Sequence, residues 1–237
     1  MSDSYTIESP GRWARMTGIL YLLVVLTGIA SELLVRNSLF VAGDIAATVD
    51  NIAAHESVFR LGFLISLTRF AFFILLVLAL YRLLRPVNEH WSLVMISFAL
   101  VSISVGMVSL LFEYASPLLL SGSDYSAVFT PDQWHAQVQF FIDMQTMGDR
   151  ASQILSVWLV PLGYLVYKSG FLPRVLGVLV VIAGIGYVAD LVVFLLLPDL
   201  DVQIAGYAFL AEVPLLLWLL VKGVDVERWR SHAAATA

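Results

Sequence analysis

TPDQWHAQVQFFIDMQTMGDRASQILSVWLVPLGYLVYK, residues 130–168, is the stretch that decides the fold. Its first half predicts an α-helix with one polar stripe, because at about 100° per residue six polar side chains share roughly a quarter of the circumference. These side chains are His135, Gln139, Asp143, Thr146, Arg150 and Gln153. The second half, from Ile154 to Tyr167, carries no charge and is typical of a membrane-buried segment. The stretch therefore predicts a helix that carries a polar stripe from outside a membrane into it.

The composition places the whole chain in a membrane. Of 237 residues, 60% are hydrophobic and 13% are charged, and the mean hydropathy is +0.89. A soluble domain is far less apolar. The chain has no cysteine, which excludes disulfides, thiolate nucleophiles and cysteine-ligated metal sites. The net charge is −5 and the 13 basic residues fall in small separate groups, so no nucleic-acid partner is expected.

Further apolar runs predict the remaining membrane helices. They extend over Met16 to Val35, Val58 to Leu84, Trp91 to Leu120, Pro173 to Leu197 and Val202 to Val221. With residues 130–168 as the fourth helix, they predict an all-α polytopic bundle of six transmembrane helices. We expect one domain over residues 13–223, between tails at 1–12 and 224–237. In the first outer loop, Gly43-Asp44 followed by IAATVDNIAAHES predicts a short capped surface helix.

The basic residues predict the orientation of this bundle. Nine of the 13 flank alternate helix ends: Arg12, Arg15, Arg82, Arg85, Lys168, Arg174, Lys222, Arg228 and Arg230. The loops at the other ends hold Asp44, Asp50, Glu56, Asp124, Asp132, Asp199 and Asp201. By the positive-inside rule, both termini are therefore predicted to be cytoplasmic.

Charged residues inside the predicted spans indicate a polar centre. Counted at 1.5 Å per residue from the cytoplasmic end of each helix, they fall at or above the membrane midplane. Such residues cost something like 2.5 to 3.5 kcal/mol each, so they should pair or face water. They predict an outward-opening polar pocket with these candidate ligand-binding residues: Glu212, Asp190, Arg150, Asp149, Arg69, Asp143, Glu32 and Glu113. No catalytic residue is assigned, and neither a metal site nor a cofactor is expected.

Structural roles compete with ligand binding at several of these positions. Glu32 and Arg36 have the spacing of an ordinary interfacial ion pair. Arg69 and Arg150 fit as ties between helices, each bonding an acid on a neighbour. On the opposite side of the fourth helix, the series Gly148, Ser152 and Ser156 predicts a close-packing face.

Glu212 is the strongest functional candidate. No basic residue lies near it on its own helix, and Pro214 removes a backbone hydrogen bond beside it. Pro161 has the same effect in the fourth helix, where it frees the carbonyl of Val157.

Three segments resemble a known family. Residues 163–177, GYLVYKSGFLPRVLG, continuing to Gly186-Tyr187 and Asp190, are similar to the bacterial membrane family catalogued as domain of unknown function 4386. LYRLLRPVN at residues 80–88 and the loop from Gly43 to Arg60 are similar to it too. The resemblance covers about Trp13 to Gly223. It implies a six-helix protein of the bacterial cytoplasmic (inner) membrane, and it implies no activity that can be carried over to particular residues.

Two functions of different classes fit these observations. The first is binding or transport of a small polar or cationic ligand, a proton or a lipid headgroup through the outward pocket. The second is a membrane-embedded lipid-modifying enzyme with Glu212 or Asp190 as general base. A non-catalytic assembly subunit is the third alternative. The excess of acids favours cation or proton handling, and the lack of a recognisable nucleophile counts against an enzyme. Membrane lipids are the expected partners, and the oligomeric state stays open.

Overall fold

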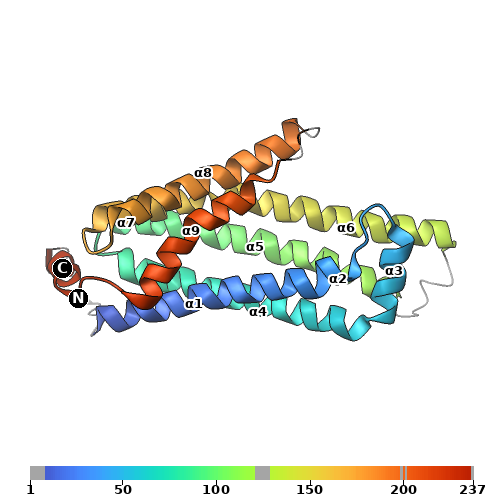
Figure 1. Ribbon diagram of the computed structural model, residues 1–237, viewed down its shortest axis with the longest axis horizontal. Helices are drawn as coiled ribbons and strands as arrows, with labels where there is room; N and C mark the ends of the chain where they lie inside the picture. Colours follow the sequence, from blue (N-terminus) through green and yellow to red (C-terminus); the bar gives the residue numbers. More distant parts are fainter. Residues whose placement is uncertain (1–8, 121–128, 198–199, 201, 236–237) are drawn as a thin grey trace. The chain divides into compact units, whose positions relative to one another are not determined.

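The protein is helical throughout the part of the chain that the computed structural model describes, residues 9–120, 129–197, 200 and 202–235 (Figure 1). Its main helices are α1 (Pro10–Ser31), α3 (Ile45–Ala54), α4 (Glu56–Leu84), α5 (Glu89–Leu120), α6 (Pro131–Ile154), α7 (Leu159–Ser169), α8 (Arg174–Leu196), α9 (Ile204–Val221) and α10 (Val226–Ala235). A π-helical turn, Glu32–Arg36, and the short α2, Asn37–Leu39, extend α1. The predicted all-α class is confirmed.

Within the described residues, five helices are long and apolar enough to cross a membrane. They cover Pro10–Leu39, Glu56–Leu84, Glu89–Ala115, Arg174–Leu196 and Ile204–Val221, and they match five of the six predicted spans. The sixth span and the single domain over 13–223 stay predictions. Residues 1–8 of the predicted tail and the loop acids Asp124, Asp199 and Asp201 lie outside the described residues. The predicted tail at 224–237 contains helix α10.

Contacts divide the chain into two compact units. Unit 1 contains the residues up to Leu22, Phe73–Ser102 and the residues from Ser152 onward, and unit 2 contains Leu23–Phe72 and Ile103–Ala151. Each is described by itself below.

In unit 2, the short helix predicted in the first outer loop is confirmed as α3. The Asp44 side chain caps its first turn by accepting a hydrogen bond from the Ala47 backbone N–H at 2.9 Å. Val49 and Ile52 are buried on one side of α3, as the pattern predicts, and Val49 packs against Val138 of α6. The start of α6 is confirmed too, because Thr130 and Gln133 form the reciprocal hydrogen bonds of a capping box.

In unit 1, tryptophans join the helix ends that the basic residues flank. The Trp13 indole N–H of α1 donates to the Ala79 carbonyl of α4 at 3.1 Å, and the Trp229 indole N–H of α10 donates to the Leu83 carbonyl at 2.9 Å. The Trp91 ring of α5 lies 5.3 Å from the Tyr164 ring of α7. These contacts hold the beginning of α1 and the C-terminal helix against the end of α4, and the beginning of α5 against α7.

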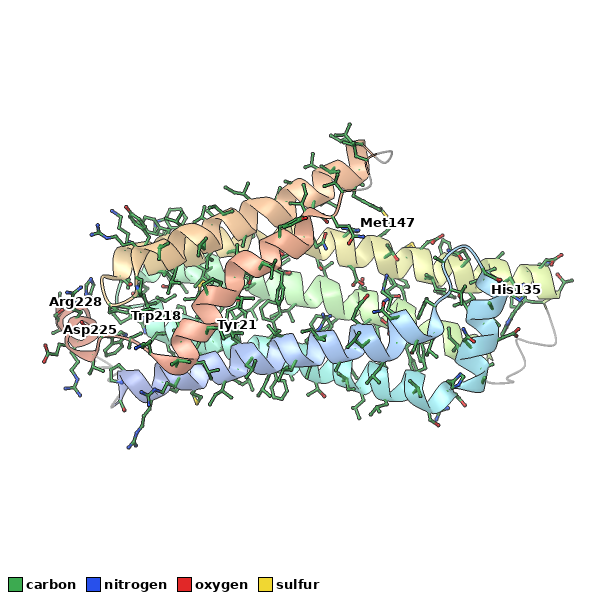
Figure 2. All side chains as sticks on the ribbon, viewed as in Figure 1. Tyr21, His135, Met147, Trp218, Asp225 and Arg228 are labelled. Carbon is green, nitrogen blue, oxygen red and sulfur yellow. The ribbon has the colours of Figure 1, made fainter. Side chains whose placement is uncertain are left out.

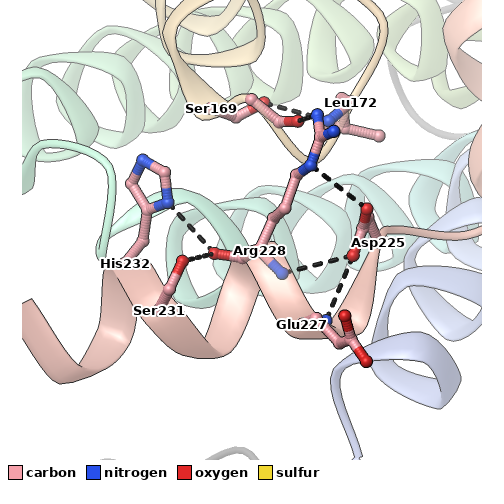
Figure 3. Close-up of polar contacts among 8 residues, drawn as sticks. Ser169, Leu172, Asp225, Glu227, Arg228, Ser231 and His232 are labelled. Carbon is pink, nitrogen blue, oxygen red and sulfur yellow. Dashed lines mark hydrogen bonds and ion pairs between the residues drawn. The ribbon is translucent and has the colours of Figure 1, made fainter.

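Helix α10 is fixed at its own beginning (Figure 3). The Asp225 carboxylate accepts hydrogen bonds from the backbone N–H groups of Glu227 and Arg228 at 3.1 and 3.2 Å. The Arg228 side chain pairs with Asp225 at 3.4 Å and donates to the Gly170 carbonyl at 3.0 Å. In the turn before α8, the Ser169 hydroxyl accepts a hydrogen bond from the Leu172 N–H at 3.2 Å. The C-terminal helix is thereby attached to the α7–α8 turn.

The fourth predicted helix is interrupted where Pro161 predicts. Residues Leu155–Trp158 form a 3₁₀ turn between α6 and α7, because the proline ring cannot sit against a regular helical turn before it. Pro214, by contrast, lies inside the continuous helix α9.

Glycines let helices of unit 1 pack with their backbones in contact. Figure 1 shows α8 beside α7 and α9. A Cβ atom added at Gly163 of α7 would lie 2.5 Å from the Gly177 carbonyl oxygen of α8. A Cβ added at Gly177 would meet the Gly163 carbonyl at the same distance. Since backbone cannot yield as a flexible side chain can, α7 and α8 need both glycines.

We therefore expect Gly163→Ala to lower the melting temperature of the detergent-solubilised protein, because overpacking costs on the order of 1–3 kcal/mol. Gly206→Ala is the matched control, since a Cβ at Gly206 in α9 meets no atom within 4 Å. Melting followed by circular dichroism measures both. Equal melting temperatures for the two variants would contradict the close contact of α7 with α8.

Candidate functional site

Unit 2 contains a polar cavity of about 90 Å³, room for a few water molecules or a small polar group. Its charged and amide lining residues come from four segments of the chain: Glu32, Arg36, Arg69, Glu113, Gln145 and Asp149. The hydroxyls of Ser31 and Ser66, which also line it, are hydrogen-bonded to each other at 2.6 Å. Four of the eight predicted ligand-binding residues therefore lie around one cavity.

The π-helical turn at the end of α1 contributes Glu32 and Arg36. The Asn37 N–H bonds to the Glu32 carbonyl, five residues earlier, which widens the helix at this point. The Arg36 guanidinium lies 3.9 Å from the Glu32 carboxylate, so the predicted ion pair is confirmed. Both side chains are largely exposed, and the pair is worth at most about 1 kcal/mol.

Glu113 and Gln145 form a buried hydrogen bond between α5 and α6. The Gln145 Nε2 donates to the Glu113 Oε2, and the two residues are only 6% and 8% exposed, respectively. The Ser109 hydroxyl of α5 donates to the Gln145 backbone carbonyl at 3.0 Å, one helical turn along. With its amide N–H₂ held by Glu113, Gln145 has its Oε1 buried without a hydrogen-bond partner. Asp149, one turn further along α6, interacts with the Ser109 hydroxyl.

Arg69 of α4 is held by packing. Its guanidinium carbon lies 5.0 Å from the centre of the Phe70 ring, a cation–π distance. The Phe70 ring in turn fills the space beside Gly106, where an added Cβ would lie 2.9 Å from it. Arg69 has no hydrogen bond or ion pair with the residues that the structure describes. Arg69 therefore bonds no acid on a neighbouring helix among those residues, but its charge acts on Glu113 of α5 and Asp149 of α6 across the cavity.

Asp190 and Glu212 belong to unit 1 and are not among the lining residues of this cavity. The Asp190 carboxylate caps α9 by accepting hydrogen bonds from the Ile204 and Ala205 N–H groups at 2.7 and 3.0 Å. Glu212 is buried and accepts a hydrogen bond from the Tyr21 hydroxyl of α1, labelled in Figure 2. Tyr187 of α8 is also hydrogen-bonded to Glu212. Glu212 therefore connects α1, α8 and α9.

The polar stripe predicted on α6 does not line the cavity. Its members include His135, labelled in Figure 2, and Asp143, whose exposed carboxylate accepts a hydrogen bond from Gln139 at 2.7 Å. Arg150 is half-buried and is not among the lining residues. The prediction that this stripe forms the polar centre is wrong, since none of its residues lines the cavity. Its exposed residues lie in the part of α6 that precedes the apolar segment.

The cavity instead faces the other side of α6, which the sequence predicts as a packing face. A Cβ added at Gly148 would lie 2.2 Å from the Ser109 Oγ, and in unit 1 the Ser102 hydroxyl donates to the Ser152 carbonyl at 3.1 Å. Close packing is thus confirmed at both positions. Gln145, which the sequence analysis missed, lies beside this face. Its seven-residue spacing from the buried Val138 is the pattern that could have revealed it.

The described residues contain no group of three or more His, Asp or Glu side chains arranged to hold a metal ion. The chemistry available at the cavity is therefore that of its carboxylates, guanidinium groups, amide and hydroxyls.

The fold and the cavity together define a class of helical protein with five apolar spans and a polar interhelical site. The chain belongs to the family described as domain of unknown function (DUF4386), whose model matches residues 16–223. The resemblance in the sequence is thus confirmed. The chain is also similar to an uncharacterized protein of Archaeoglobus fulgidus, with 33% identity over 147 residues, which are 61% of this chain and 73% of that protein. No solved structure matches the chain.

The Glu212 contacts yield a stability prediction. Tyr21→Phe removes one hydroxyl donor from a buried carboxyl group, which costs about 1–3 kcal/mol, so the melting temperature should fall. The matched control is Tyr207→Phe, because Tyr207 also lies in unit 1, on α9, but is 75% exposed. In a Glu212→Leu background the cost of Tyr21→Phe should largely disappear. Equal melting temperatures for the Tyr21→Phe and Tyr207→Phe proteins would contradict a stabilising hydrogen bond between Tyr21 and Glu212.

Proposed function

We propose that this integral membrane protein binds a small polar ligand carrying positive charge in the cavity of unit 2. The observation that carries the proposal is Gln145, a residue that lines the cavity and whose buried Oε1 acceptor has no partner among the described residues. A buried acceptor without a donor costs about 1–3 kcal/mol. A ligand N–H or O–H group would remove that cost.

The charges around the cavity favour a cation. Glu32 and Arg36 compensate each other, which leaves Glu113 and Asp149 against Arg69. The remaining lining thus holds one more acidic group than basic groups, in a region where charges are expensive. A protonated amine supplies both the missing positive charge and a hydrogen-bond donor for Gln145.

The contacts in unit 1 favour binding over the enzyme alternative. Glu212, a candidate general base, is engaged by two tyrosines, and Asp190, the other candidate, caps a helix. Both contacts are of the kind that stabilise a fold.

This function predicts binding that depends on Gln145. Purified protein should bind ethanolamine or phosphoethanolamine in isothermal titration calorimetry, and Gln145→Met should weaken binding roughly 10- to 100-fold by removing a hydrogen bond to a charged group. Gln139→Met is the matched control, because Gln139 is an exposed glutamine on the same helix, bonded to Asp143. It should bind as the parent does. No binding of either probe, or equal losses in both variants, would overturn the proposal.

We further propose that α6 and α7 form a sixth span and that the cavity opens to the outside. The first turn of α1 lies against the end of α9, since a Cβ at Gly223 would be 3.3 Å from the Gly11 carbonyl. Two helix ends on one side of a membrane require an even number of crossings between them, and the apolar helices supply five. The positive-inside rule makes this the cytoplasmic side of a bacterial inner membrane. The cavity residues Glu32 and Arg36 lie at the opposite end of the α1 span.

Cysteine labelling tests this orientation, and the chain has no cysteine of its own. His55→Cys, between α3 and α4, should react in intact cells with a membrane-impermeant thiol reagent. His90→Cys, near the beginning of α5, should react only after lysis. Both histidines are exposed, so accessibility within the protein is matched. The reverse labelling pattern would contradict the orientation and place the cavity on the cytoplasmic side.

A further inference from the structure

We infer that the ligand of the unit 2 cavity is a zwitterion, a small molecule or headgroup that carries both a protonated amine and an oxyanion. This inference rests on the proposed function, which requires only a polar ligand with positive charge. It adds a second ligand group, which Arg69 would bind.

The guanidinium of Arg69 indicates the oxyanion. It carries five N–H donors, and none is hydrogen-bonded to a residue that the structure describes. Its planar fork matches the two oxygens of a phosphate or carboxylate. An arginine that served only as a tie between helices would have its donors on a neighbouring acid or carbonyl. Here the guanidinium lines a cavity and rests on an aromatic ring.

Small residues keep Arg69 in this position. A Cβ added at Gly28 of α1 would lie 3.5 Å from the Arg69 Cδ and 3.8 Å from its Nη1, so the side chain lies across the open surface of that glycine. Phe70, which carries the guanidinium on its ring, is itself fixed beside Gly106. The guanidinium is therefore positioned by packing, with its N–H groups left for a ligand.

The opposite chemistry lies on α5 and α6. Gln145 lines the cavity and its Oε1 has no partner among the described residues, and the carboxyl groups of Glu113 and Asp149 lie on the same two helices. These are acceptors for an ammonium group. An anion alone would add charge to a lining that already has an excess acid, and a simple amine would leave the donors of Arg69 unused. A zwitterion satisfies both halves of the cavity at once.

Phosphoethanolamine is a suitable probe, because it joins a primary ammonium to a phosphate through two carbons. The same chemistry is available from a free metabolite or from the headgroup of phosphatidylethanolamine. Calorimetry with the purified full chain should show at least 10-fold tighter binding of phosphoethanolamine than of ethanolamine, and weak or no binding of inorganic phosphate.

Arg69→Gln should abolish this preference by weakening phosphoethanolamine binding at least 10-fold without weakening ethanolamine binding, because the substitution removes a positive charge from the cavity. Arg60→Gln is the matched control on α4, because Arg60 is exposed and paired with Glu56 at 2.6 Å. If Arg69→Gln does not fold, Arg69→Lys keeps the charge, loses the planar fork and should show a smaller loss of the same preference. Native mass spectrometry from nanodiscs then distinguishes the two sources: the headgroup source predicts retained phosphatidylethanolamine over phosphatidylglycerol, lost in Arg69→Gln, and the free source predicts no lipid preference.

The failures of the two proposals differ. Ethanolamine binding that depends on Gln145 but equals phosphoethanolamine binding, with no effect of Arg69→Gln, would overturn the zwitterion and keep the proposed function. No Gln145-dependent binding of either probe would overturn both.

Discussion

The hydrogen bond between Glu113 and Gln145 is the interaction on which the proposed site depends. A carboxyl group and an amide buried between two helices lose hydrogen bonds to water, so a hydrogen bond between them is stabilising. The bond holds the donor end of the Gln145 amide, and the acceptor end is buried without a partner among the described residues. Ser109 and the missing side chain of Gly148 bring α5 and α6 close enough for it to form. Packing in unit 2 thus orients the group that a ligand would contact.

In unit 1, the buried polar groups of the described residues have hydrogen-bond partners within the protein. The Glu212 carboxyl is met by two tyrosines, the Asp190 carboxylate by two backbone N–H groups, and the indoles of Trp13 and Trp229 by carbonyls. Among the buried side-chain polar atoms that the structure describes, Gln145 Oε1 is the one without a partner. Satisfied groups stabilise a fold, whereas an unsatisfied one beside a cavity indicates a missing ligand or water. This contrast shifts the functional candidate from Glu212, which the sequence favours, to the α5–α6 side of unit 2.

The sequence predicted helices better than faces. Apolar run length and end signals such as Asp44 and Thr130 predicted five spans, α3 and the beginning of α6, since these depend on local physics. Depth counting also grouped the intramembrane charges, and four of the predicted residues, Glu32, Arg69, Glu113 and Asp149, line one cavity. Depth counting could not separate Glu212 and Asp190 from them, because the sequence of one helix does not show which side chains on other helices it contacts. The polar stripe on α6 does not line the cavity for a related reason, because a polar helix face outside the membrane faces water. Gln145 was missed because it is neutral and lies among packing residues.

A density map of the full chain in lipid nanodiscs tests the central claim most directly, because it shows what lies beside Gln145. The account predicts density larger than a water molecule in the unit 2 cavity, within about 3 Å of Gln145 Oε1 and extending to the Arg69 guanidinium. Side chains filling the cavity, with Oε1 bonded to a protein donor, would contradict it. Water alone in the cavity of protein prepared with saturating phosphoethanolamine would contradict it as well.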